Sequence, residues 1–539
     1  MSTQKEEGKD IKLTTNDNFT PSQFSKDFLS ALKYRAALTQ TENGAVALST
    51  SFSHLLDLFG LIGALREREE QGIIDTFLPA YNENKELALK ILFYARDIRG
   101  TQGLGERNTF RVILRHLAMN YPQDIEHLIP QIPFYGRWDD LLVLIGTPLQ
   151  NAALDVIAAQ YKADVSALTS GETNEISLLA KWLPSVNASS SKTRAFAAQV
   201  CHHLHTSHKE YRKTLSSLRA ALRVTEKLMS SKQWDKIDYP TVPSRAALIY
   251  SAAFFRNDEE RYSAYIESLA RGETKINAST LYPYDIIAPY VHRFCGFNID
   301  GETPEQLALL EQQWKALPDY LASAEASAQR YLVMADTSGS MFGGRTVPPI
   351  ATSVGLALYF AERTTGYFAN HFLTFSADPR LVEVPANLSL VDKIHTVLND
   401  DYVGFSTDLD KAFALVLYTA MSNHVPQSEL PTSILVISDM EIDECLENYD
   451  YYKTPPITFT DRWSQKFQDA GYTMPSIVYW NVASRHPTFH ATQDDNVRFV
   501  SGHSASTFTT LCKTNGMSAL ETMLTTILDP RYDAIYIKK

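Results

Sequence analysis

The spacing of apolar residues changes near residue 331 and divides the chain into two parts. In the first part, apolar residues recur every three or four positions, which is the period of a helix that buries one face. Three clear sets are Phe52, Leu55, Leu56, Phe59 and Ile62, then Leu87, Ile91, Tyr94, Ala95 and Ile98, and then Phe110, Ile113, Leu114 and Leu117. Strand-like alternation is scarce, and prolines and glycines separate helices of ~10–20 residues. We therefore predict that residues 21–300 form an α-helical repeat domain, a HEAT-like α-solenoid whose repeats share no fixed sequence period.

In the second part, short apolar runs alternate with helical patterns, which is typical of a parallel sheet covered by helices. The predicted strands are 332–335, 371–376, 381–384, 434–438, 477–481 and 497–500. We expect an α/β doubly wound domain over residues 331–539. Residues 301–330 are predicted as a helical connector, because Thr303 can cap a helix that starts at Pro304. The polar residues 1–20 are predicted as a disordered tail.

Oxygen-bearing side chains follow several of the predicted strands. The run YLVMADTSGSM places Asp336, Ser338 and Ser340 directly after a buried strand. Thr407 lies in a loop before a predicted helix, and Asp439 follows another buried strand. Because the ligand sites of parallel sheets lie beyond the carboxyl ends of the strands, we expect these five side chains to meet. Their hard oxygen atoms favour Mg²⁺, with Ca²⁺ or Mn²⁺ as alternatives, over zinc or copper.

One strongly basic segment interrupts the acidic average of the chain. Residues 192–232, the basic segment, hold nine Lys or Arg against two Glu, a net charge of +7, whereas the whole chain carries −12. A surface of this kind can hold the phosphates of a nucleic acid. The alternative is a solvated helix face that acidic neighbours balance elsewhere in the fold. The candidate RNA-binding residues in this segment are Lys192, Arg194, His202, His203, Arg212, Lys213, Arg219 and Arg223.

A second group of arginines surrounds the glycine-rich stretch after residue 99. Arg96 and Arg99 lie at the end of a predicted helix, and Arg107 opens the next one. Arginines beside a helix start suit phosphate oxygens, so these three are also RNA-binding candidates. The alternative, which we favour, is structural: Arg96 and Arg99 would pair with Asp97, with Glu106 or with carbonyl groups at the helix end.

Composition narrows the class of protein. A chain of 539 residues with 44% hydrophobic and 21% charged positions exceeds one ordinary core and predicts two or more globular domains. The four cysteines are scattered without CxxC spacing, which fits a reducing compartment. No apolar run approaches the ~18 residues of a membrane span, and the start of the chain has no signal-peptide pattern. We expect a soluble, cytoplasmic, monomeric protein.

The five oxygen ligands resemble the metal-ion-dependent adhesion site of von Willebrand A domains, in which Asp-x-Ser-x-Ser is followed by a threonine and an aspartate. The matching residues are Asp336, Ser338, Ser340, Thr407 and Asp439. Gly404 and Phe405 stand where many A domains have a glycine pair, and Met440 stands where glycine is common. Neither departure removes a ligand. The resemblance implies a divalent-cation site that docks a partner's carboxylate.

The combination of helical repeats with a C-terminal A domain resembles the Ro autoantigen family of TROVE-domain RNA-binding proteins. The motifs that carry this resemblance are FYARDIRGTQGLGERNTFR, KWLPS, YRKTLSSLRAALRVTEKLMSSKQWDKIDY, INASTLYPYDI and LVMADTSGSM. The resemblance covers most of the chain. It implies that the helical repeats close into a ring through the A domain. It also implies a basic hole for the single-stranded end of a misfolded RNA, and an outer rim for structured noncoding RNA.

Two functions are compatible with these features, and a third is not. The first is a non-catalytic RNA-binding scaffold, the protein part of a ribonucleoprotein. The second is a protein–protein interaction scaffold that recognises a partner carboxylate through the A-domain metal, without RNA. An enzyme is not expected, because a single metal held mostly by hydroxyl groups is a poor two-metal site and no nucleophile–base pair is legible.

Overall fold

A computed structural model describes most of the chain. The described residues are 33, 36–41, 46–100, 102–276, 281–292, 296–297, 302–322, 329–343, 347–375, 378–398, 408–441, 459–491, 497–504 and 507–538. The predicted metal ligand Thr407 and the predicted tail 1–20 lie outside them. Within the described ranges, no helix combines the length and the apolar character that a bilayer crossing needs.

The first part of the chain is mostly helical, as its hydrophobic period predicts. Most residues of the three apolar sets lie on α2 (His54–Leu61), α4 (Lys85–Arg96) and α5 (Asn108–Asn120) and are buried. Phe52, Ile62 and Ile98 lie just outside these helices, and Ile98 is exposed. The other helices are α3 (Glu70–Glu83), α6 (Pro122–Ile125), α7 (Ile132–Tyr135), α8 (Gln150–Ser170), α9 (Leu179–Trp182), α10 (Ser191–His203), α11 (His208–Ala221), α12 (Thr225–Ser230), α13 (Ser244–Ala270), α14 (Pro283–Ile287) and α15 (Pro304–Lys315). Short 3₁₀ segments also occur, among them η1 (Ile62–Ala64) and η3 (Trp138–Leu144).

Local capping explains where several of these helices begin. The Asn84 side chain accepts a hydrogen bond from the Leu87 amide at the start of α4. Ser207 and Glu210 form a reciprocal capping box at the start of α11. Thr303 caps α15 in the same way, and Pro304 occupies its first turn, as the sequence predicts.

The expectation of helices alone is wrong at both ends of the first part. Two antiparallel strand pairs are present there: β1 (Leu38–Gln40) with β2 (Val46–Leu48), and β3 (Val291–His292) with β4 (Gly296–Phe297). The main chain of Leu48 also exchanges two hydrogen bonds of 2.8 Å with Phe489. Phe489 lies about 440 positions from Leu48 in the sequence. Pairing over such a distance leaves no periodic pattern of apolar residues, because it is a long-range contact.

The second part builds a six-stranded sheet in the order β10–β9–β8–β5–β6–β7. Its strands are β5 (Tyr331–Asp336), β6 (His371–Phe375), β7 (Leu381–Glu383), β8 (Ser433–Ser438), β9 (Ser476–Asn481) and β10 (Val497–Ser501). The neighbours from β10 to β6 pair in parallel, and β7 pairs antiparallel with β6 at the edge. The predicted strands are confirmed, but the sheet is mixed rather than wholly parallel.

Helices cover both faces of this sheet, so alternate residues of each strand enter different cores. Leu332 and Met334 of β5 belong to the same core as Phe413, whereas Val333 and Ala335 pack into the other. The first core includes residues of α19 (Leu409–Ser422), α20 (Phe459–Asp469) and α22 (Ala519–Ile527). The second includes residues of α17 (Pro349–Ala361), α18 (Leu390–Val397) and α21 (Thr507–Lys513).

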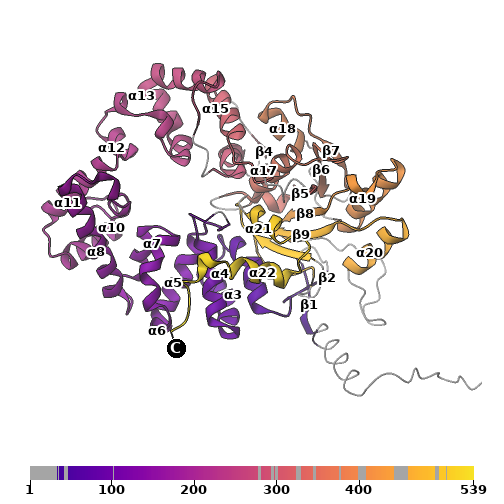
Figure 1. The fold of residues 1–539 in the computed structure, drawn as a ribbon, viewed down its shortest axis with the longest axis horizontal. Helices are drawn as coiled ribbons and strands as arrows, with labels where there is room; N and C mark the ends of the chain where they lie inside the picture. The colour runs from indigo at the N-terminus through magenta and orange to yellow at the C-terminus, as the bar shows by residue number, and fades with distance from the viewer. Residues whose placement is uncertain are drawn as a thin grey trace, which may run out of the picture.

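The helices of the first part follow an arc whose two ends both pack on the sheet domain. In Figure 1 the arc runs from α3–α5 through α8 and α11 to α13 and α15, and the yellow α22 lies beside α4. At the beginning of the arc, α2 contacts β10 and α22, and α22 contacts α4. At its end, α14 contacts α17 and α15 contacts α18. The chain therefore closes on itself through the sheet domain.

Polar contacts reinforce the closure at the beginning of the arc. The amide of Gly63 in η1 donates a 2.9 Å hydrogen bond to the Ser501 hydroxyl at the end of β10. The buried carboxylate of Asp97 accepts hydrogen bonds from Nε and Nη2 of the Arg531 guanidinium, with Nη2 2.8 Å from Oδ1. Arg531 lies in η10 (Pro530–Tyr532) near the C-terminus. The last residues thus hold the first helices against the sheet.

Candidate functional site

The carboxyl ends of β5 and β8 meet where the strand order reverses. From β5 the chain continues to β6 on one side and returns to β8 on the other, and such switch points form the ligand crevices of open α/β sheets. Asp336 ends β5, Asp439 directly follows β8, and both are buried. Burial, and then the neighbouring Asp439 carboxylate, raise the pKa of Asp336 to about 6. The two predicted aspartate ligands are therefore close enough to interact.

Hydroxyl groups border the same two carboxylates. The Ser438 hydroxyl donates a 2.5 Å hydrogen bond to one oxygen of Asp336, and the Ser338 amide donates to the other at 2.9 Å. The Ser338 and Ser340 hydroxyl oxygens lie 3.0 Å apart. The structure thus brings together four of the five predicted ligands, and the fifth, Thr407, lies outside the described residues.

The loop after β8 has Met440 where A domains commonly have glycine. The backbone of this residue shows the effect of the difference. Met440 adopts a left-handed backbone with φ 66°, a conformation that glycine enters far more easily than other residues. The Arg485 guanidinium donates a 2.9 Å hydrogen bond to Asp439, and the His486 ring nitrogen lies 3.1 Å from the Glu441 carboxylate. Basic side chains from the β9–β10 connection therefore already neutralise part of the acidic loop.

The donor set suits a hard divalent cation. Two enclosed carboxylates beside two hydroxyl groups offer only oxygen atoms, the ligands that Mg²⁺ prefers. Within the described ranges, no group of three or more His, Cys, Asp or Glu side chains is placed to hold a metal. The predicted ligand set is of a different kind, because three of its five side chains supply hydroxyl groups rather than carboxylates. The cation would be held by Asp336, Ser338, Ser340 and Asp439.

The basic segment forms α10, α11, α12 and the residues between them. The exposed predicted RNA-binding side chains in it are Lys192, Arg194, His202, Arg212, Lys213 and Arg223. Arg219 is engaged within the fold: it donates to the carbonyl groups of Ala180 and Leu183, and burial lowers its pKa. His203 lies 2.8 Å from the Asp155 carboxylate on α8. The segment thus contains exposed side chains and side chains with internal partners, and Arg194 is both, because it donates 2.7 Å hydrogen bonds to the carbonyl groups of Ala188 and Ser189.

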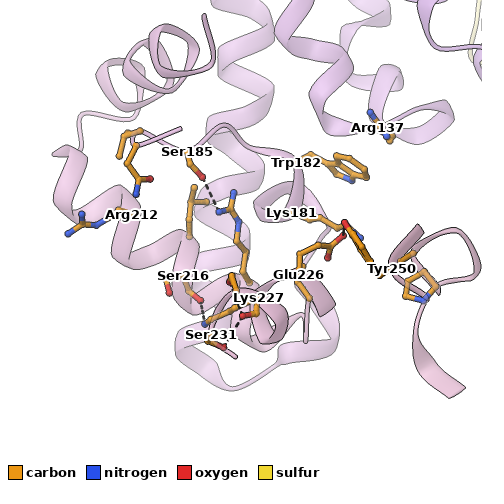
Figure 2. Close-up of a pocket in the computed structure, with 18 of the residues that line it drawn as sticks. Arg137, Lys181, Trp182, Ser185, Arg212, Ser216, Glu226, Lys227, Ser231 and Tyr250 are labelled. Atoms are coloured by element: carbon orange, nitrogen blue, oxygen red, sulfur yellow. Dashed lines mark hydrogen bonds between the residues drawn. The ribbon is translucent and has the colours of Figure 1, made fainter. Parts of the chain in front are cut away.

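A cavity of about 840 Å³ opens between α9, α11, α12 and α13, and it is called the basic cavity below. Its basic lining residues are Arg137, Lys181, Arg212, Arg219, Lys227 and Arg245, and its acidic lining residue is Glu226. Figure 2 shows Arg137 and Trp182 on one side of the cavity and Arg212 on the opposite side. Positive charge therefore converges from several elements on one concave surface, although the whole chain is acidic.

Arg137 and Trp182 are functional candidates that the sequence reasoning missed. The Arg137 guanidinium carbon lies 3.8 Å from the centroid of the Trp182 ring, a cation–π contact. Two further hydrogen bonds to the Asp139 carboxylate hold the guanidinium in place. The adjacent Lys181 lies 5.6 Å from the same ring. A basic–aromatic pair such as Lys181–Trp182 is a weak sequence signal, and nothing local links it to Arg137.

The arginines around the glycine-rich stretch have three different environments. Arg96 needs a correction as an RNA-binding candidate: its guanidinium is buried, donates a 2.8 Å hydrogen bond from Nε to the buried carboxylate of Asp140, and forms an ion pair with it. Arg99 is exposed and lines a second cavity. The Arg107 side chain is exposed. Partial desolvation, and then the nearby positive charge of Arg137, lower the pKa of its guanidinium.

Comparisons with known proteins match both parts of the chain. A family described as a domain of unknown function, DUF2828, matches residues 41–145 and 149–325. A second, described as a domain of unknown function, DUF7788, matches residues 331–529. Uncharacterized protein L728 of Acanthamoeba polyphaga mimivirus is 29% identical over 481 residues, which cover 83% of this chain and 79% of that protein.

A solved structure also matches most of the chain. It is the crystal structure of the Deinococcus radiodurans RO (RSR) protein, with 15% sequence identity over 89% of this chain and 99% of that chain. The TM-score is 0.36, so the two backbones do not superpose closely. The fold and the sites described above therefore rest on this chain's own residues and contacts.

Proposed function

This chain belongs to the DUF2828 family, and we propose that it is a non-catalytic RNA-binding scaffold that holds single-stranded RNA in its basic cavity. In this proposal the helical arc is a HEAT-like repeat closed by a von Willebrand A-like domain, in the manner of Ro proteins. The observation that carries the proposal is the basic cavity itself, which gathers six Arg or Lys side chains against one Glu. Misfolded or noncoding RNA with a free single strand is the expected ligand class.

The lining of the basic cavity combines the two contacts that single strands need. Basic side chains neutralise phosphates, and aromatic rings or guanidinium planes stack against unpaired bases. Arg212 is exposed, and within the described residues it has neither a hydrogen bond nor an ion pair, so its charge is available. Trp182 and the Arg137 above it form a preassembled planar surface.

We expect the Arg212→Glu variant to bind a labelled single-stranded U15 RNA about tenfold or more weakly at low salt. A charge-assisted contact contributes about 1.5–3 kcal/mol, and each tenfold in Kd corresponds to about 1.4 kcal/mol. The plot of log Kd against log salt should also become shallower, because fewer phosphates are neutralised. Fluorescence anisotropy at several salt concentrations measures both effects, and the melting temperature should stay unchanged because the side chain is exposed.

Lys213→Glu is the matched control for this experiment. Lys213 is the next residue on α11 and is also exposed, but it does not line the basic cavity. The charge change is identical, so a smaller loss of affinity than in Arg212→Glu locates the strand in the cavity. Equal losses in both variants would indicate a diffuse basic surface. Wild-type protein that fails to bind U15 at low salt, or binds it without a salt slope, would refute the proposal.

A second candidate function rests on the two aspartates at the switch point. Asp336 and Asp439 lie at the carboxyl ends of β5 and β8 beside two serine hydroxyls, an arrangement suited to a divalent cation, with Mg²⁺ favoured. A bound cation supplies an electrophilic position for a carboxylate of a protein partner. In that function the chain is a protein–protein interaction scaffold, and it can coexist with RNA binding because the two sites lie on different parts of the chain.

We expect Mg²⁺ to raise the melting temperature of the wild-type protein but not that of Asp336→Asn. A ligand at 100 times its Kd stabilises the folded state by about 2.7 kcal/mol. Asparagine keeps the size of the side chain but loses one of the two anionic ligands. Thermal unfolding with 0 and 10 mM MgCl₂, and with MnCl₂ in parallel, measures the shift. The control is Glu383→Gln, an exposed acid on the edge strand β7, and an Mg²⁺ shift that persists in Asp336→Asn would contradict a cation at this site.

A further inference from the structure

A second cavity of about 500 Å³ lies beside the basic cavity and is lined mainly by apolar and aromatic groups. Its lining includes Arg99, Pro133, Phe134, Trp138, Gln160 and Leu178, and it is called the aromatic cavity below. No acidic residue lines it. Its volume falls within the range of about 300–1,000 Å³ that is usual for ligand sites.

Large apolar side chains are unusually exposed around this aromatic cavity. Phe134 is 50% exposed, although the other residues of α7 are buried, and Leu178, directly before α9, is 47% exposed. Ile98, which is 42% exposed, adjoins them, because its amide donates a 2.9 Å hydrogen bond to the carbonyl of Tyr135. An exposed apolar patch with an aromatic ring at its centre marks a place where something binds.

The aromatic cavity and the basic cavity share a wall. Trp138 lines the first and Arg137, its neighbour in the chain, lines the second. In the same way Leu178 lines the first, while Lys181 and Trp182 of the adjoining α9 line the second. The two cavities therefore lie next to each other.

We propose that the aromatic cavity is a base-stacking subsite for the same RNA strand whose phosphates the basic cavity holds. The inference rests on the proposed RNA binding and adds where an unpaired base is received. A base would stack against Phe134 and Trp138, and Arg99 at the rim would face a flanking phosphate. Arg99 is exposed and no acidic residue lines the aromatic cavity, which favours a nucleic acid strand over an apolar peptide.

Base stacking and phosphate contacts depend differently on salt, and this difference distinguishes the subsite from the basic cavity. Phe134→Ala should weaken binding of single-stranded U15 RNA about tenfold at every salt concentration, the effect of losing one stacked base. The slope of log Kd against log salt should stay at the wild-type value, because no charge is removed. Arg212→Glu, in contrast, should lower the slope. Fluorescence anisotropy from 25 to 300 mM KCl, on the full-length protein, measures all of these.

Phe134 also contacts protein groups, so folding must be tested separately. Its ring meets Tyr135 edge-on at 4.9 Å between centroids, and the Arg531 guanidinium lies 5.1 Å from its centroid. Phe134→Trp keeps an aromatic plane and should restore U15 affinity, and Leu178→Ser tests a second lining residue of the cavity. Tyr418→Ala is the matched control, since this tyrosine of α19 is 69% exposed and lies outside both cavities.

The outcomes separate this inference from the function on which it rests. Weaker U15 binding in Phe134→Ala, an unchanged salt slope and rescue by Phe134→Trp support the subsite. Wild-type affinity in both Phe134→Ala and Leu178→Ser, while Arg212→Glu still binds weakly, overturns the subsite and leaves the basic cavity as the RNA site. Failure of the wild-type protein to bind U15 overturns both.

Discussion

Replacing Asp140 with alanine should lower the free energy of unfolding by about 3–5 kcal/mol, because it leaves a buried charge without its partner. The Asp140 carboxylate is fully buried and accepts hydrogen bonds from the buried Arg96, from Arg111 Nε at 2.7 Å, and from the Arg137 amide at 2.9 Å. Removing it leaves the Arg96 guanidinium without its ion-pair partner in the core between α4 and η3. Urea denaturation at pH 7, with the midpoint and the slope both fitted, measures the loss.

Asp139→Ala provides the control at the neighbouring position. Asp139 pairs with Arg111 and Arg137, but its side chain remains partly exposed, so water replaces the lost contacts. We expect a loss of about 1 kcal/mol or less for that variant. Similar losses in the two variants would show that the Arg96–Asp140 pair is not enclosed in solution. A loss of RNA affinity in Asp140→Ala is also expected, because Arg137 and the wall between the two cavities depend on this carboxylate.

Gly63→Ala should destabilise the protein by about 2–3 kcal/mol by forcing the helical arc away from the sheet. A Cβ atom at Gly63 would lie 2.5 Å from the Ser501 carbonyl oxygen and 2.7 Å from the Gly502 amide nitrogen. These are main-chain atoms of the β10 end, so no side-chain rotation relieves the overlap. The variant should also lose the hydrogen bond from the Gly63 amide to the Ser501 hydroxyl. Thermal unfolding of the purified protein checks this result.

Gly72→Ala should instead raise the stability of the protein. Gly72 lies within α3, and a Cβ atom there would meet only the flexible end of the Arg68 side chain, at 3.4 Å. Alanine in a helix interior is favoured over glycine by about 0.5–1 kcal/mol. Both variants change the conformational entropy of the unfolded chain equally. The difference between their free energies of unfolding therefore reports the contact between η1 and β10. A Gly63→Ala protein as stable as Gly72→Ala would contradict the closure of the arc.

Much of the fold of the second part could be predicted from the sequence. A strand buried on both faces appears as a short continuous apolar run, and the runs at β5, β8 and β9 are of this kind. Helix starts were equally local, as the Thr303 cap of α15 demonstrates. The hairpin of β1 with β2 was not predicted, because strands of three residues are too short to show the alternation that marks a strand. The antiparallel direction of β7 was also missed, although its partner β6 is its neighbour in the sequence.

The two candidate sites differ in how far the sequence led to them. Asp336 and Asp439 each follow a buried strand, so the rule for parallel sheets was enough to expect them at one place. The basic cavity was expected only as a charged segment. Its Arg137–Trp182 contact joins residues 45 positions apart, and no periodic pattern encodes a distance of that kind.

What the sequence by itself determined is therefore local: helical period, helix caps, buried strand runs, and the surplus of positive charge between residues 192 and 232. What only the tertiary structure decided is which charges are available to a ligand. Arg96 and Arg212 are both arginines on helices, yet Arg96 is enclosed with Asp140, whereas Arg212 lines an open cavity. The physical reason is that helix and strand patterns arise from contacts within a few residues. Ion pairs and cavities arise instead from the packing of elements that folding brings together from distant positions.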